Sequence, residues 1–105
     1  MEYELTEETF THEVLEAQGL VLVDFYATWC PPCKMMNPVI QNLAQEYHGR
    51  VKVGRIDSDK APNLSQKYQI LSIPTFLFFR DGKLLDEATG AMPKEMLAEK
   101  LEALL

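Results

Sequence analysis

The chain has 105 residues, of which 47% are hydrophobic and 25% are charged, and these fractions are ordinary for a soluble globular protein. Ten basic residues against sixteen acidic ones give a formal net charge of −6 at pH 7, which argues against nucleic acid or an anionic membrane as a partner. The length fits one domain with one hydrophobic core, so we expect residues 1–105 to form a single domain.

Neither a membrane segment nor a secretion signal is predicted. No apolar run approaches the roughly 20 residues that a membrane-spanning helix needs. The N-terminal stretch Met1-Glu2-Tyr3-Glu4 is acidic and lacks the basic and apolar regions of a signal peptide. We therefore expect a cytoplasmic protein.

The first quarter of the chain predicts a short strand, a surface helix and a buried strand. Residues 2–5 favour an edge strand, and Thr6 is typical of a helix cap because acidic residues follow it in the first turn. We expect that helix to end at Gly19. Its apolar residues at helical spacing are Phe10, Val14 and Ala17. Residues 20–27 are almost continuously apolar, which indicates a strand buried on both faces.

Asp24 interrupts this apolar strand. Ionising a carboxyl group inside a protein costs several kcal/mol, roughly, so buried carboxylates are uncommon unless they are paired or functional. A functional role is favoured because the strand leads directly to a pair of cysteines. The alternative is that Asp24 caps a backbone N–H or lies at a sheet edge.

The rest of the chain alternates between helical and strand patterns. A helix is predicted from Pro32 to Tyr47, a strand over residues 51–56, and a short helix around Leu64. Further predictions are a strand over residues 76–79, a hairpin turn at Asp81-Gly82, a strand over residues 84–88, and a last helix that begins at about Pro93. The order βαβαβαββα predicts an α/β protein, a three-layer sandwich with helices on both faces of a mixed sheet.

The only two cysteines, Cys30 and Cys33, lie where the buried strand gives way to a helix. Free backbone N–H groups and the helix dipole favour an anion at a helix N-terminus, so the thiol pKa of Cys30 should be lowered and the thiol should be nucleophilic. In a reducing compartment, a close cysteine pair is either catalytic or metal-binding.

Metal and haem sites are disfavoured alternatives. Two cysteines supply half of a structural zinc site, and His12 and His48 are distant in sequence and not spaced like a zinc pair. Lys34 stands where a C-x-x-C-H haem motif requires histidine. A binding module in which the dithiol is incidental stays open at this point.

The sequence resembles the thioredoxin family over essentially its whole length. The matching residues are Val23-Asp24-Phe25, Ala27, Trp29-Cys30, Pro32-Cys33-Lys34, Pro38, Ile73-Pro74-Thr75, Asp81-Gly82 and Gly90-Ala91. The resemblance implies a thioredoxin fold with a central mixed sheet of about five strands and four helices. It also implies a protein-disulfide reductase, an electron carrier that uses reversible Cys30–Cys33 dithiol/disulfide exchange.

The resemblance assigns roles to individual residues. Cys30 would be the nucleophile that forms a mixed disulfide with the substrate, and the less exposed Cys33 would be the resolving thiol. Asp24 would lie beneath Cys33 and exchange its proton, and Pro74 would be a cis-proline beside the dithiol. The apolar surface that receives the partner would consist of Trp29, Ile73, Pro74, Gly90 and Ala91.

The implied partners are disulfide-containing client proteins and, as electron donor, a thioredoxin reductase. No bound cofactor or metal is implied, because the redox centre is the cysteine pair itself, and we expect a monomer. An oxidase or isomerase of folding proteins on the same scaffold is the alternative, but it needs a more oxidising potential and compartment.

Three residues depart from the family pattern. Pro31 stands where most thioredoxins have glycine, beside the typical Pro32. Tyr26 replaces a common tryptophan, and Arg55 replaces the usual lysine next to the buried carboxylate. Arginine stays charged and is bulkier than lysine, so the electrostatic environment of Asp24 should differ from that in relatives.

Overall fold

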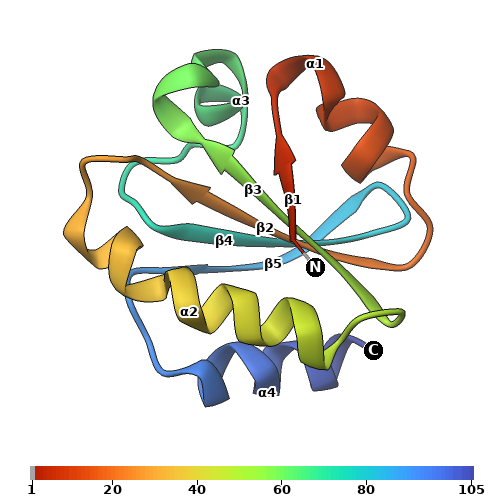
Figure 1. Ribbon diagram of the computed structural model, residues 1–105. Coiled ribbons are helices and arrows are strands. Elements are labelled where there is room, and N and C mark those ends of the chain that lie inside the picture. The colour runs from red at the N-terminus through yellow and green to blue at the C-terminus, as the bar shows by residue number, and fades with distance from the viewer. Residues whose placement is uncertain (1) are drawn as a thin grey trace.

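A five-stranded mixed sheet forms the centre of the computed structural model, which describes residues 2–105 (Figure 1). The strands are β1 (Glu2–Leu5), β2 (Leu20–Tyr26), β3 (Val51–Asp57), β4 (Thr75–Arg80) and β5 (Lys83–Thr89). Their order across the sheet is β1-β3-β2-β4-β5. The pairs β1–β3 and β2–β3 are parallel, whereas β2–β4 and β4–β5 are antiparallel.

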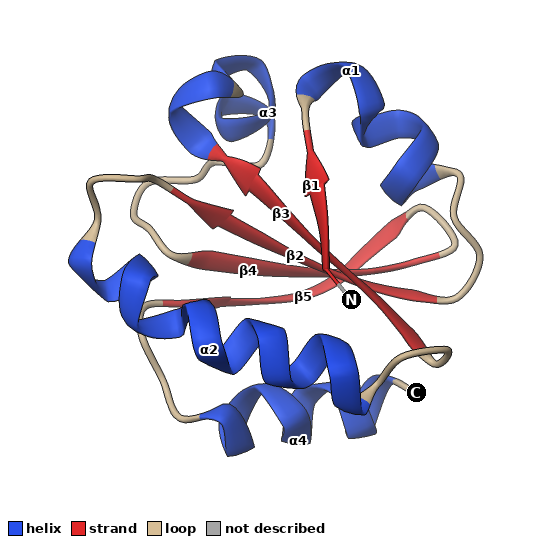
Figure 2. Ribbon diagram, in the orientation of Figure 1, coloured by secondary structure: helices blue, strands red, loops and turns tan. Residues whose placement is uncertain are grey.

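Helices cover both faces of the sheet, which confirms the predicted three-layer α/β sandwich (Figure 2). The long helices α2 (Pro31–Glu46) and α4 (Lys94–Leu104) lie together on one face. The other face carries α1 (Glu7–Phe10), which continues as a π-helical segment, η1 (Thr11–Leu15), and also α3 (Pro62–Lys67). A short 3₁₀ helix, η2 (Ser58–Lys60), precedes α3.

The apolar run of β2 is buried on both faces because side chains alternate along the strand. Leu20 and Leu22 pack into the core beneath α2 and α4, whereas Val21 and Val23 pack into the core beneath α1 and α3. By the same alternation, Asp24 points towards the α2 face. The central position of β2 therefore places this carboxyl group inside the molecule.

The predicted start of the first helix is confirmed in detail. Thr6 and Thr9 form a reciprocal capping box, in which the backbone N–H of Thr9 donates to Oγ1 of Thr6 at 3.2 Å and the backbone N–H of Thr6 donates to Oγ1 of Thr9 at 3.0 Å. The predicted end was wrong, because helical structure stops at Leu15 and Gly19 belongs to the following turn. Gly19 has φ +82 and donates its N–H to Oδ1 of Asp81 at 2.9 Å, so its conformation serves the approach to β2.

Two helix boundaries differ slightly from the sequence prediction. The helix α2 begins at Pro31 rather than Pro32, and Pro93 is the N-cap of α4 rather than its first helical residue. Both differences lie within the one or two residues by which helix ends fray. Among the helices of residues 2–105, none combines the length and the apolar character that a membrane crossing requires.

Candidate functional site

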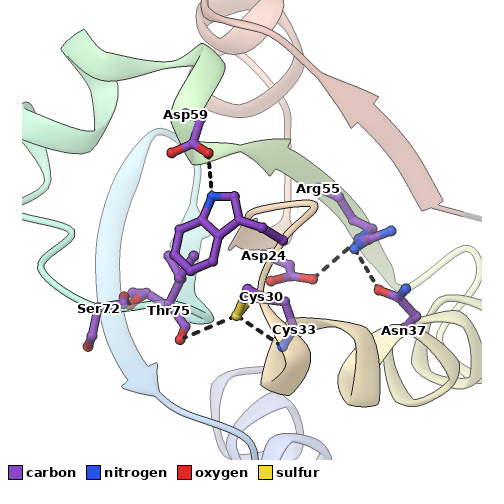
Figure 3. The surroundings of a disulfide bond; sticks show 10 residues. Asp24, Cys30, Cys33, Asn37, Arg55, Asp59, Ser72 and Thr75 are labelled. Atoms are coloured by element: carbon purple, nitrogen blue, oxygen red, sulfur yellow. Dashed lines mark hydrogen bonds and ion pairs between the residues drawn. A yellow bond between two sulfur atoms is a disulfide. The ribbon is translucent and has the colours of Figure 1, made fainter.

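The strand β2 and the helix α2 together place the two cysteines. Cys30 is the N-cap of α2, with extended backbone angles, and a disulfide joins it to Cys33 with a Cα–Cα distance of 5.2 Å (Figure 3). Pro31 and Pro32 occupy the first two helical positions, where neither has an N–H to donate. The first helical N–H is therefore that of Cys33, and it donates to Sγ of Cys30 at 3.3 Å.

This hydrogen bond makes the two sulfur atoms unequal. A donor aimed at Sγ of Cys30, at the positive end of a 16-residue helix, stabilises a thiolate there. The resemblance implied that Cys33 is less exposed than Cys30. In the disulfide form the two differ little, because Cys30 is 3% exposed and Cys33 is 2% exposed. Tyr26, Ala27 and Ile73 pack against the pair and cover both residues.

The loop before β4 lies beside the disulfide. The peptide bond between Ile73 and Pro74 is cis, as the resemblance implied, and the carbonyl oxygen of Ile73 lies 3.9 Å from Sγ of Cys30. The N–H of Gly90 donates to the carbonyl oxygen of Pro74 at 2.8 Å, and Oγ1 of Thr75 donates to the carbonyl oxygen of Ser72 at 2.6 Å. The first bond joins the segments around residues 74 and 90 next to Cys30, and the second closes the turn before β4.

The predicted docking residues do not contribute equally to the surface. Trp29 is 64% exposed and Ala91 is exposed, whereas Ile73 is half-buried and Pro74 is buried. Nε1 of Trp29 donates to Oδ2 of Asp59 at 2.6 Å, which fixes the indole ring over the site. Pro74 therefore supports the surface from below.

Asp24 is only 1% exposed, and β2 is the middle strand, so the sheet-edge interpretation is wrong. Nε of Arg55, on the neighbouring strand β3, donates to Oδ2 of Asp24 at 3.3 Å. Within residues 2–105, this is the only hydrogen bond that the Asp24 carboxyl group makes. The other oxygen, Oδ1, is buried without a partner in the described part of the chain.

The surroundings of Asp24 favour its protonated form. Burial raises the pKa of the carboxyl group to about 6, the positive charge of Arg55 acts in the opposite direction, and Glu2 and Glu4 on β1 add to the rise. Such a pKa suits a group that accepts and returns a proton near neutral pH.

Sequence reasoning missed the residues that surround Arg55. Oδ1 of Asn37, on α2, accepts from Nη2 of Arg55 at 2.7 Å, and the guanidinium carbon lies 4.1 Å from the ring centroid of Tyr26. The Tyr26 hydroxyl donates to Oε2 of Glu4 at 2.7 Å. Asn37 follows Cys33 by four residues, so helical spacing alone would have placed both on one face of α2.

A small hollow opens beside these groups. It has a volume of about 210 Å³, and Cys33, Asn37 and Arg55 are among the residues that line it. Its size suits water or a proton-carrying group rather than an organic cofactor. Within residues 2–105, no three His, Cys, Asp or Glu side chains cluster in a way that could hold a metal ion.

Known proteins resemble this chain along most of its length. The family model described as Thioredoxin matches residues 2–103. The chain is 43% identical over 100 residues to "Thioredoxin" of Chlorobaculum thiosulfatiphilum, which covers 95% of this chain and 93% of that protein. It is 46% identical over 98 residues to "Thioredoxin 1" of Synechococcus elongatus, with 93% and 92% covered. It is 48% identical over 84 residues to "Thioredoxin" of Staphylococcus aureus, with 80% and 81% covered.

Proposed function

The chain belongs to the thioredoxin family, and from this premise we propose which residues carry each step of its reaction. As a family member it is a thiol–disulfide oxidoreductase that reduces protein disulfides through its Cys30–Cys33 pair. The observation that supports the assignment of roles is the hydrogen bond from the first available N–H of α2 to Sγ of Cys30.

In the first step, the Cys30 thiolate attacks one sulfur of a client disulfide. A bond forms between Sγ of Cys30 and that sulfur, the client S–S bond breaks, and the other client sulfur leaves as a thiolate that takes a proton. The helix N-terminus and the Cys33 N–H favour the ionised form of Cys30.

In the second step, Cys33 loses its proton to Asp24 and attacks Sγ of Cys30. The mixed disulfide breaks, the second client sulfur leaves with a proton, and the Cys30–Cys33 disulfide forms. The client has gained two electrons from the cysteine pair and two protons; one proton balances the one lost by Cys33, and the other comes from solvent because Cys30 enters the reaction as a thiolate. The buried position of Asp24 and its unpartnered oxygen support this role as proton acceptor.

The client would bind across the exposed face next to the disulfide. Trp29 and Ala91 offer apolar contact area, and Gly90 and Pro74 hold the neighbouring loops in place. An extended client segment would pair with the backbone of Ile73, as in strand addition, because its carbonyl oxygen lies beside Cys30.

The donor and the setting are further parts of the proposal. A thioredoxin reductase would return two electrons to the Cys30–Cys33 disulfide, with no bound cofactor in this chain. The protein would act as a monomeric electron carrier in the cytoplasm and contribute to redox homeostasis there.

Insulin reduction tests the proposed function. Wild-type protein supplied with a thioredoxin reductase and its reductant should cleave the insulin interchain disulfides catalytically, measured as precipitation of the free B chain. Cys30→Ser should abolish the reaction. A Cys30→Ser variant with undiminished activity would show that Cys30 is not the attacking group.

A further inference from the structure

We propose that Asn37 is a positioning residue that divides the hydrogen bonds of Arg55, so that only one oxygen of Asp24 is engaged and the other stays free for the proton of Cys33. The link to Cys33 rests on the role of Asp24 proposed above, whereas the effect on Asp24 itself does not.

The guanidinium group of Arg55 does not bind Asp24 through two hydrogen bonds. Arginine usually grips a carboxylate with two parallel N–H bonds, which for a side-on approach come from Nε and Nη2. Here these two donors go to different residues, with Nε 3.3 Å from Oδ2 of Asp24 and Nη2 2.7 Å from Oδ1 of Asn37 (Figure 3). The shorter bond is the one to Asn37, so the amide group sets where Arg55 lies.

Tyr26 holds the guanidinium from another side. Its ring centroid lies 4.1 Å from the guanidinium carbon, and its hydroxyl is tied to Glu4 on β1. Arg55 is therefore confined between a ring, an amide and a carboxyl group. Oδ1 of Asp24 is buried without a partner within residues 2–105, although a two-bond grip by Arg55 would have supplied one.

The position of Arg55 relative to Asp24 controls how strongly the carboxylate form of Asp24 is stabilised. Arg55 on β3 is the cation that acts on Asp24 among the described residues, whereas Glu2 and Glu4 on β1 oppose ionisation. On β4 the residue opposite Asp24 is Phe76, which does not titrate. The side of α2 carries the disulfide-bonded cysteines and Lys34, an exposed residue that lines the same hollow as Cys33 and Arg55. A second bond from Arg55 would stabilise the carboxylate and cover Oδ1.

Removing the Asn37 amide should therefore free Nη2 of Arg55 to donate a hydrogen bond to the Asp24 carboxyl group. Nearby opposite charges lower a carboxyl pKa by about 1–3 units, so Asn37→Ala should lower that of Asp24 by about one unit, a tenfold change in its ionisation constant. The variant should fold, because alanine has a higher helix propensity than asparagine.

Carbon-13 NMR titration of the Asp24 side chain in the oxidised protein measures its pKa directly and does not depend on catalytic activity. Asn42→Ala is the matched control, because Asn42 is an exposed residue on the same helix, and it should leave the titration of Asp24 unchanged. Asn37→Asp keeps an acceptor oxygen for Nη2, so the pKa of Asp24 should not fall. An unchanged or raised pKa in Asn37→Ala, or an equal fall in Asn37→Asp, would overturn the inference.

Kinetics then separates the inference from the proposed function. If Asp24 accepts the Cys33 proton, the acid limb of the activity–pH profile of Asn37→Ala should move to lower pH together with the titration. A lowered pKa with an unmoved acid limb would uphold the positioning of Arg55 by Asn37 and refute the proton-acceptor role of Asp24.

Discussion

At the scale of single residues, the two cysteines differ in their hydrogen bonding more than in their exposure. Cys30 and Cys33 are both buried in the disulfide form, but Sγ of Cys30 accepts the N–H of Cys33. Bonding to the charged form of a group lowers its pKa. Cys30 should therefore be the thiolate that meets the substrate.

Substrate capture tests this asymmetry. Cys33→Ser should hold client proteins as mixed disulfides through Cys30, because the resolving thiol is missing, whereas Cys30→Ser should hold almost none. Non-reducing gels of client mixtures measure the difference, and the double cysteine-to-serine variant gives the background. Equal capture by the two single variants would contradict the assignment.

Asp24 should make the stability of the oxidised protein depend on pH. Its pKa is about 6 in the folded chain, above the ordinary aspartate value of 3.8 that applies in the unfolded chain, so the unfolded chain loses this proton first as the pH rises. Stability is therefore undiminished below about pH 4, falls between about pH 4 and 6, and stays lower above that range. A shift of this size corresponds to roughly 3 kcal/mol at neutral pH.

Asp24→Asn should remove the loss of folding stability that comes from ionising Asp24 in the folded protein. The variant should be more stable than the wild type by up to about 3 kcal/mol at pH 7, with little difference at pH 4, and its disulfide exchange should be slower. Urea unfolding at both pH values measures the first effect, and insulin reduction measures the second. A stability difference that is the same at both pH values would show that burial does not raise the pKa of Asp24.

At the scale of elements, the start of α2 is the part of the site that differs most from the thioredoxin family pattern. Pro31 and Pro32 fix φ in the first turn and leave the N–H of Cys33 as the first donor to Cys30. Because proline restrains the reduced loop, the loop loses less conformational entropy when the disulfide closes. Pro31 also has no N–H to donate, so the Cys30 thiolate is stabilised less than it would be with glycine at this position. Both effects favour the disulfide and make the dithiol a stronger reductant.

Pro31→Gly should therefore raise the reduction potential modestly. A compatible exchange between proline and glycine is worth about 0.4–1 kcal/mol, or on the order of 10–20 mV for two electrons. Equilibration with glutathione buffers measures the potential. Pro62→Gly is a control, because Pro62 also begins a helix, α3, outside the disulfide loop, and should leave the potential unchanged. A lower potential in Pro31→Gly would refute the entropy argument.

Element boundaries and types were predictable where the apolar pattern was long. The strand β2 and the helix α2 agree with the predicted ranges to within one residue, because burial imposes a clear period on both. The π-helical segment Thr11–Leu15 was not predicted, since its sequence carries an ordinary helical pattern and the wider turn depends on tertiary packing.

At the scale of the whole molecule, the sheet order brings distant segments to one site. The cysteines, Asp24 and Pro74 could be named from sequence because the motifs that contain them resemble those of a known family. The contacts of Trp29 with Asp59 and of Arg55 with Asn37 could not, because they join residues thirty and eighteen positions apart and depend on how α2 and the loop after β3 pack on the sheet.

The Cys30–Cys33 pair can serve as a reductant of protein disulfides only if its standard reduction potential is low. Equilibration with glutathione at pH 7 measures this potential. We expect a value close to the general reference of about −270 mV for thioredoxin, with Pro31 lowering it slightly. A potential above about −200 mV, in the range of disulfide isomerases, would contradict the assignment as a reductase.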